Sequence, residues 1–237
     1  MYSFEEGVSF VRKHIPGFEV RYKNENFVSK LIGVLVWPFC RRYMKDFTST
    51  RFGKVYFPSR EYVRENQSVA FKILMHEFVH LWDEKEKGWR FRIDYLLPQL
   101  YGPVNILFAI VWFLVVTEPA WARWTFGSLG LVVGIAMFFP WPSGGRCNAE
   151  VRGYAMNLAL NYWKYGSIRS STILWIVDKF TGWDYYKMAW HEDEVRGWFR
   201  SARIRIEAGL FGPCSICGEN GAPYNLVKHM LDKSKVE

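Results

Sequence analysis

The residues best able to do chemistry form the short sequence HEFVH at positions 76–80. On a helix, side chains four residues apart lie on the same face, so His76 and His80 would point at a common position. Two imidazoles suit zinc, and a catalytic zinc site adds a third protein ligand and a water whose pKa falls to about 7. Glu77 could take a proton from that water and pass it to a leaving amine. The pattern predicts zinc ligands at His76 and His80, with Glu77 as the general base.

The surrounding residues favour a helix that follows a strand. Apolar residues recur at helical spacing over residues 69–82, and the helix is expected to continue to Gly88. Residues 54–57 alternate as a strand does, Pro58 closes the strand, and Ser59 suits a helix N-cap. The alternative is a surface pair of histidines beside a salt-bridged glutamate, with no metal.

This order of strand and helix resembles that of zincins, a group of zinc metallopeptidases. The metzincin pattern needs a Gly and then a His or Asp where this chain has Asp83 and Glu86. The gluzincin arrangement, with a Glu from a later helix, fits Glu150, which begins an amphipathic stretch after a break rich in Pro and Gly. Four residues on, where the family often has an Asp that orients a ligand histidine, this chain has Tyr154. The alternative for Glu150 is an acid favoured by a helix N-terminus.

Two long uncharged runs lie between the halves of the predicted metal site, at residues 96–117 and 124–145. About twenty apolar residues cross a bilayer, so the runs predict a transmembrane helical hairpin. Trp121, Trp124 and Trp141 lie near their ends, where indoles prefer to be. The alternative is a pair of core helices, but a chain of this size has little surface with which to cover both.

The basic residues predict how the hairpin is oriented. Most of them flank its outer ends, and one lies in the connector: Lys85, Lys87, Arg90 and Arg92 before, Arg146 and Arg152 after, and Arg123 between. Cytoplasmic flanks carry the excess of Lys and Arg, so both termini and the active site are expected on the cytoplasmic side of a protein with two spans. A hairpin also returns the chain to one side, as a shared metal site requires.

Composition favours lipid over nucleic acid as a partner. The 237 residues carry a net charge of +8, half are apolar and 19% are aromatic, and no RNA- or DNA-binding motif occurs. The apolar run at residues 31–37 is too short to span a bilayer. With Lys30 before it and Arg41, Arg42 and Lys45 after, it could instead lie in the membrane interface. Packing against the core is the alternative.

The layout resembles the HtpX-like membrane zinc peptidases, in which two membrane helices separate H-E-x-x-H from the ligand Glu. The resemblance covers residues 52–165 and rests on HEFVH, the hairpin and Glu150, while the N-terminal pair of spans in that family is missing. Residues 88–96 followed by EVRGY are also similar to small gluzincin-like proteins. The resemblance implies a zinc endopeptidase acting on polypeptides, with His76, His80 and Glu150 as ligands and Glu77 as base.

Further candidates lie towards the C-terminus. The tetrahedral intermediate of peptide hydrolysis carries an oxyanion, which a zincin stabilises with a hydrogen-bond donor, commonly Tyr or His. The candidates are His191, Tyr154, Tyr185 and Tyr186. His191 is the catalytic candidate among them, with a charged surface as its alternative setting.

The tail contains Cys214-x-x-Cys217, and with His229 these residues could supply three of the four ligands of a second metal. Two ordinary thiols are the alternative.

The sequence predicts an α+β, mostly helical fold: a zincin-like metallopeptidase core with an inserted transmembrane helical hairpin. The expected parts are amphipathic helices (1–50), a strand and the H-E-x-x-H helix (51–95), the hairpin (96–145), the Glu-ligand helix with the helical C-terminal part (146–210), and the cysteine tail (211–237). A non-catalytic, membrane-associated metal-binding scaffold with a zincin fold is the alternative function.

Overall fold

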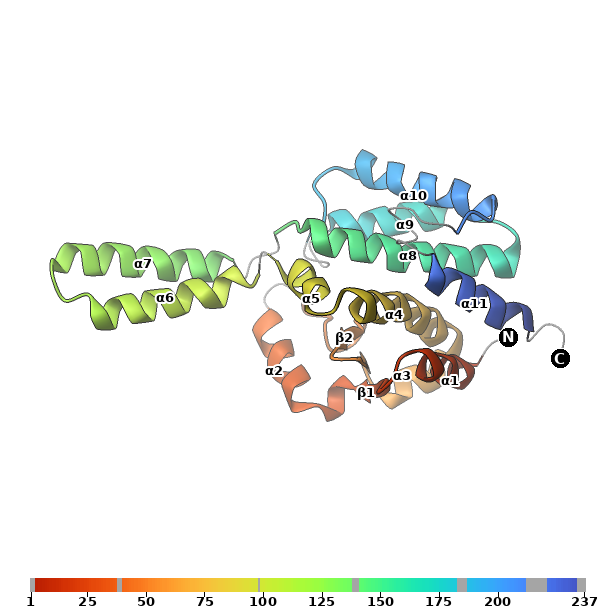
Figure 1. The fold of residues 1–237 in the computed structure, drawn as a ribbon, viewed down its shortest axis with the longest axis horizontal. Coiled ribbons are helices and arrows are strands. Elements are labelled where there is room, and N and C mark those ends of the chain that lie inside the picture. Colours follow the sequence, from red (N-terminus) through yellow and green to blue (C-terminus); the bar gives the residue numbers. More distant parts are fainter. Residues whose placement is uncertain are drawn as a thin grey trace.

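The computed structural model describes residues 3–37, 40–97, 99–137, 141–182, 187–211 and 221–233. Helices dominate and one small sheet accompanies them, which confirms the predicted α+β, mostly helical class (Figure 1). The elements in chain order are α1 (Phe4–His14), β1 (Glu19–Tyr22), the 3-10 helix η1 (Lys23–Glu25), α2 (Phe27–Val36), β2 (Ser49–Arg51), β3 (Lys54–Phe57), α3 (Arg60–Glu65), α4 (Gln67–Lys87), α5 (Trp89–Leu96), α6 (Tyr101–Val115), α7 (Ala120–Ala136), α8 (Gly144–Tyr165), α9 (Ser170–Thr181), α10 (Glu192–Glu207) and α11 (Ala222–Lys233).

The sheet has three strands in the order β1-β3-β2, with β1 parallel and β2 antiparallel to β3. The predicted strand is β3, whose Val55 and Phe57 are fully buried on one face. The sequence did not indicate β1 or β2, because both are short and polar. β2 is joined to β3 through Phe52 and Gly53, which both have positive φ.

The helix α4 carries the HEFVH motif and lies at the centre of the core. It runs from Gln67 to Lys87 and ends at Gly88 as predicted. Ser59 is an N-cap as expected, but it caps the short α3 rather than α4. In Figure 1, α4 lies between the layer of α1 and the sheet on one side and the layer of α8, α9 and α10 on the other. The motif is therefore buried between two layers.

The two uncharged runs form the antiparallel helices α6 and α7, which project from the body as a hairpin (Figure 1). Both helices are shorter than the runs of residues 96–117 and 124–145, with 15 and 17 residues. None of the described helices is, taken alone, long and apolar enough to cross a membrane. Only α5 and α6 taken together, across a bend of 81°, reach that length and composition.

Candidate metal centre

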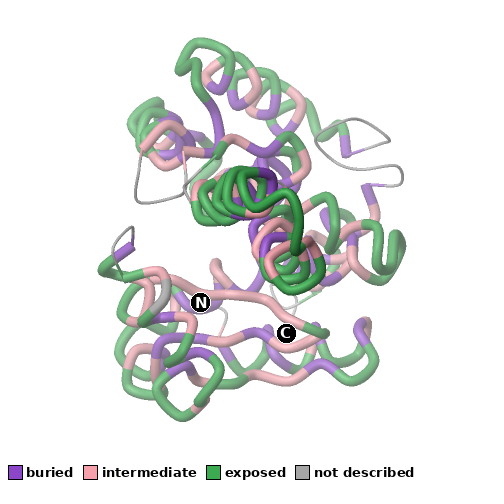
Figure 2. Tube along the Cα trace, turned by 90° about the vertical axis from the view of Figure 1, so that its left-hand side faces the viewer, coloured by how far each residue is buried: buried purple, intermediate pink, exposed green. Residues whose placement is uncertain are grey.

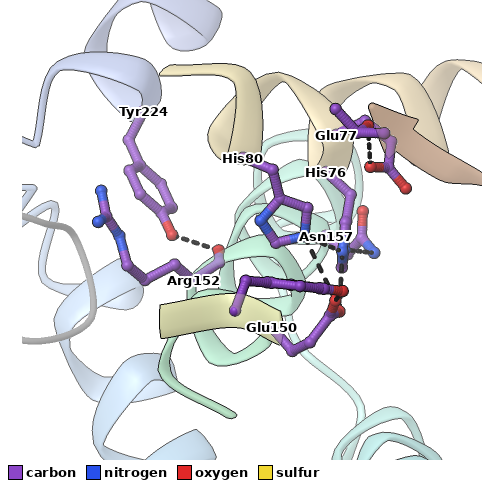
Figure 3. Close-up of polar contacts among 9 residues, drawn as sticks. His76, Glu77, His80, Glu150, Arg152, Asn157 and Tyr224 are labelled. Carbon is purple, nitrogen blue, oxygen red and sulfur yellow. Dashed lines mark hydrogen bonds and ion pairs between the residues drawn. The ribbon is translucent and has the colours of Figure 1, made fainter. Parts of the chain in front are cut away.

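The side chains of His76, His80 and Glu150 converge between α4 and α8 (Figure 3). His76 Nε2 lies 3.2 Å from Glu150 Oε2 and 3.0 Å from His80 Nε2, which in turn lies 3.5 Å from Glu150 Oε1. Both histidines are buried. Glu150 is well inside α8, which begins at Gly144, so the start of this helix does not account for the acid.

The three groups fit a tetrahedral zinc. Zinc binds imidazole nitrogen and carboxylate oxygen at about 2.0–2.2 Å, which sets neighbouring ligand atoms roughly 3.3–3.5 Å apart. The separations of 3.0, 3.2 and 3.5 Å lie close to that value. Among the residues that the structure describes, this is the one group of His, Cys, Asp and Glu found close enough to hold a metal ion.

The charges of the cluster favour a cation. Burial by itself would raise the pKa of Glu150, but His80 and His76 outweigh it and hold that pKa well below its usual value. Burial would likewise lower the pKa of His80, but Glu150, with smaller contributions from Glu77 and Asp83, outweighs it and raises the pKa to about 9. The carboxylate is therefore ionised and attracts positive charge, whether a proton or a metal ion.

Polar side chains around the cluster orient its members. The Tyr95 hydroxyl donates to Glu150 Oε1 at 2.6 Å. Asn157 Nδ2 lies 3.4 Å from His76 Nδ1, while Asn157 Oδ1 is buried without a hydrogen-bond partner in the described part of the chain. If the amide is turned over, Oδ1 accepts from Nδ1–H of His76, and Nε2 keeps its lone pair for a cation. Orienting contacts of this kind are usual around zinc ligands.

Aromatic rings pack against both histidines of the cluster. The ring of Tyr154 lies edge-on to His76, with 4.9 Å between centroids, and the rings of Phe91 and Tyr95 lie 6.3 Å and 6.0 Å from His80. Tyr154 itself is buried. The segment that resembled gluzincin-like proteins thus contributes Phe91 and Tyr95 to the surroundings of the cluster.

Glu77 is held apart from the three converging side chains. Thr50, from β2, donates its hydroxyl to Glu77 Oε2 at 2.5 Å. Glu77 is almost fully buried and directly follows His76 in α4. A carboxylate fixed next to a metal ligand, but outside the ligand group, is suited to proton transfer.

Gly153 allows α8 to approach α4 closely. A Cβ on Gly153 would lie 2.5 Å from both Cε1 and Nε2 of the His76 ring, far closer than real Cβ contacts allow. Gly153 is three residues after Glu150, so it lies on the same face of α8. The close approach of His76 and Glu150 therefore depends on a missing side chain.

Gly153→Ala is expected to weaken zinc binding by about 10- to 100-fold, because the added methyl pushes His76 away from Glu150. Zinc affinity, measured by competition with a chromogenic chelator, tests this. Gly197→Ala in α10 is the matched control, since a Cβ there meets nothing within 4 Å. Equal zinc affinity in the two variants would contradict the packing argument.

A buried ion pair joins α4 and α8 next to the cluster. Arg152 Nη1 of α8 lies 2.5 Å from Asp83 Oδ1 of α4, and both side chains are almost fully buried. The hydroxyl of Tyr224, on α11, donates to the Arg152 carbonyl at 2.6 Å (Figure 3). Asp83, at a position where the metzincin pattern needs Gly, therefore fixes α8 against α4.

Lys23 is fully buried, and Glu77 is close enough for its charge to act on the Lys23 ammonium. Its Nζ donates to the Tyr43 carbonyl at 3.0 Å and lies 3.5 Å from the centre of the Tyr43 ring. Burial lowers the pKa of Lys23 from 10.5 to about 7. Glu77 and Cys40 oppose that shift, and Arg51 adds to it.

Lys23 is therefore expected to raise the stability of the fold between about pH 7 and pH 10, whereas His80 without a metal, with its pKa raised to about 9, lowers the stability as the pH rises from about 6.5 to 9. Between about pH 7 and pH 10 the unfolded chain keeps a proton on Lys23 that the folded chain has lost, so the contribution of Lys23 to the free energy of unfolding increases by up to about 1.4 kcal/mol per pH unit. Below pH 7 both states bind the proton and this contribution is constant. In denaturant titrations at several pH values, Lys23→Met should have a lower slope of unfolding free energy against pH than wild type, whereas Lys13→Met, at an exposed position, should keep the wild-type slope. An equal slope of unfolding free energy against pH in wild type and Lys23→Met would contradict the contribution assigned to Lys23.

The other predicted site residues lie outside this cluster. His191 is exposed as the N-cap residue of α10, and His229 is exposed on α11. Among the described residues, no contact joins His191 to the cluster. Cys214, Cys217, Tyr185 and Tyr186 lie outside the described residues, so the second metal site stays a prediction.

Four of the residues that shape the site were not identified as such from the sequence: Thr50, Asp83, Gly153 and Asn157. Asn157 and Gly153 share a face of α8 with Glu150, and that helical spacing was the one available signal. Comparisons of the chain with protein-family models, with curated proteins and with solved structures found no match.

Proposed function

We propose that this protein is a zinc-dependent metallopeptidase with a zincin-like core, anchored to a membrane by the α6–α7 hairpin. The observation that carries the proposal is the convergence of His76, His80 and Glu150 with Glu77 fixed beside them. These three residues would hold the ion. When bound, zinc supplies Lewis-acid polarisation of a carbonyl and acidification of water.

The chain's own residues account for the proton transfers. Glu77 accepts a proton from the attacking water and delivers it to the leaving amine. Thr50 holds one oxygen of Glu77 through a hydrogen bond, which restricts the carboxylate to one orientation. Tyr95 and Asn157 orient the ligands Glu150 and His76.

The sheet supports a polypeptide as the substrate. β2 carries Thr50, and among the described strands only β3 pairs with it. An extended peptide can add to an exposed strand edge through main-chain hydrogen bonds. A peptide on β2 would lie next to Glu77.

The distribution of side chains in the hairpin supports insertion into lipid. The residues buried between α6 and α7 are small, and the exposed ones are mostly large and apolar. Figure 2 shows that most of the hairpin is exposed. A Cβ on Gly127 or Gly134 would lie 2.6 Å from Phe113 or Ile106 of the facing helix. Small residues between helices and large ones outside are typical of membrane helix pairs. In water the same hairpin would expose Leu107, Leu114 and other large side chains at a cost in free energy.

The dimensions and ends of the hairpin also suit a thin bilayer. At 1.5 Å per residue, α6 and α7 are about 22 Å and about 26 Å long, against a hydrocarbon core of about 30 Å. Trp121 and Trp124 are exposed near the tip and Trp141 near the base, where indoles anchor in the interfaces. The first and last described helices, α1 and α11, lie at the end of the body far from the hairpin (Figure 1), which supports a common side of the membrane for these helices and the site.

The proposal is tested by measuring zinc per chain and casein cleavage for detergent-purified protein. Wild type is expected to hold one zinc and to cleave, whereas Glu150→Gln should bind zinc more than about 100-fold more weakly, since a neutral amide replaces the carboxylate ligand. Glu65→Gln, at an exposed position, is the control and should behave as wild type. Wild-type protein without zinc would overturn the proposal.

A non-catalytic scaffold is the second candidate. One observation favours it: the predicted oxyanion donor His191 is exposed without contact to the cluster among the described residues, and the Tyr95 hydroxyl is already bonded to Glu150. Zinc binding without cleavage of casein in wild type would support the scaffold.

A further inference from the structure

The helix α2 presents its apolar side to solvent. Phe27, Val28, Leu31 and Val34 are 50–77% exposed, and Trp37, directly after the helix, is 59% exposed. The first four lie at helical spacing, so they form one stripe. A helix on the surface of a protein in water normally turns such a stripe inward.

The opposite side of α2 fixes the helix to the body through small and polar groups. Ser29 is fully buried, and its hydroxyl accepts from Arg51 Nη2 of β2 at 2.6 Å. A Cβ on Gly33 would lie 2.9 Å from Met44, so the helix backbone packs closely there. The exposed stripe is therefore a consequence of the packing of α2 rather than of a loose helix.

Two neighbouring elements extend the apolar surface. Phe52, at the turn between β2 and β3, is 73% exposed and lies under the guanidinium of Arg92 of α5. Trp89 and Leu96 of α5 are also exposed. Figure 1 shows α2 and α5 at the end of the body from which the hairpin emerges. We call α2 with Trp37, Phe52 and the exposed residues of α5 the apolar rim.

Basic side chains accompany the apolar rim. Lys30, Arg41 and Lys45 are exposed, and the Arg41 guanidinium lies 5.3 Å from the centre of the Trp37 ring. On α5, Arg90 lies 5.9 Å from the ring of Trp89. Apolar side chains bordered by Lys and Arg match an acyl boundary beneath anionic headgroups, each cation strengthening binding by about fivefold.

We propose that the apolar rim docks on the surface of an anionic bilayer, beside the point where the hairpin enters it. Its continuity with the uncharged hairpin and its basic border identify lipid as the occupant. Phe52 follows Arg51 and Thr50 in the chain, so docking holds the edge of β2 at the membrane surface. Resting on the proposed function, this makes the substrate a polypeptide segment that lies close to the bilayer.

Hydrogen exchange of α2 tests the docking without any need for zinc or cleavage. The full chain is reconstituted in vesicles of phosphatidylcholine alone and of phosphatidylcholine with phosphatidylserine. Exchange of the α2 amides is expected to be about tenfold slower in the anionic vesicles, and high salt should remove most of the difference. Leu31→Ser and Val34→Ser should each reduce the protection by about tenfold, because burial of one such side chain corresponds to about one decade. Ile204→Ser, at an exposed apolar position on α10, is the control and should leave it unchanged.

The outcomes separate this inference from the peptidase proposal. Equal exchange of α2 in both kinds of vesicle and in detergent overturns the docking, whatever the activity. Protection that rises with protein concentration in detergent also overturns it, since a second copy would then be the occupant. Protection in anionic vesicles from a chain that cleaves nothing upholds the docking and removes only the statement about substrate.

Discussion

Glu77→Gln is expected to lower the rate of casein cleavage by about 10²- to 10⁴-fold while the protein keeps its zinc. Gln has the size of Glu and can still accept the hydrogen bond from Thr50, but it cannot take up a proton. The ligands His76, His80 and Glu150 are untouched. The loss should therefore appear in kcat, with zinc per chain and melting temperature unchanged.

The same measurements identify a contaminating protease. Glu65→Gln, the exposed control, should retain the wild-type rate and zinc content. If Glu77→Gln cleaved casein as fast as wild type, the activity would come from another protein or from another group, and Glu77 would lose its assigned role. A variant that lost zinc as well would show that Glu77 supports the site rather than the proton transfer.

Asp83→Asn is expected to reduce the free energy of unfolding by about 3–5 kcal/mol, because it leaves the Arg152 guanidinium buried without its counter-ion. Burial raises the pKa of Asp83 and Arg152 lowers it, with burial the larger effect. Burying the pair is therefore costly in free energy. Removing one partner costs more, because the other charge then stays buried and unpaired. Since it joins α4 to α8, zinc affinity should fall by about 10- to 100-fold as well. Denaturant unfolding and zinc competition measure the two effects.

Two further variants show how much of the loss comes from a charge that is left buried without a partner. Glu207→Gln, which removes a partly exposed i,i+4 pair with Arg203, should cost less than about 1 kcal/mol. Replacing both buried partners, as Asp83→Leu with Arg152→Met, should restore much of the stability, since no unpaired charge then remains. A loss as small for Asp83→Asn as for Glu207→Gln would contradict the assigned role of the pair.

The sequence alone determined the elements whose signal is local. The helix α4 and its end at Gly88 follow from apolar spacing and a C-terminal glycine, and β3 follows from alternation before Pro58. Spacing of four residues also placed His76 and His80 on one face before any tertiary contact was known.

Tertiary structure decided which groups complete the site. Thr50 reaches Glu77 from a strand that is too short and polar to be recognised, and Asn157 reaches His76 from another layer. Gly153 matters only because α8 lies against the His76 ring. None of these contacts leaves a local pattern, since each joins residues distant in sequence.

The position of Glu150 combines both kinds of information. Residue type and the motif suggested a carboxylate beyond the hairpin, but its approach to within 3.2 Å of His76 depends on the packing of α4 against α8. The uncharged character of residues 96–117 and 124–145 was likewise evident in the sequence, whereas their folding into two shorter helices with glycines facing inward was not. Local spacing fixes which residues share a face. Which faces meet is set by burial summed over the whole chain.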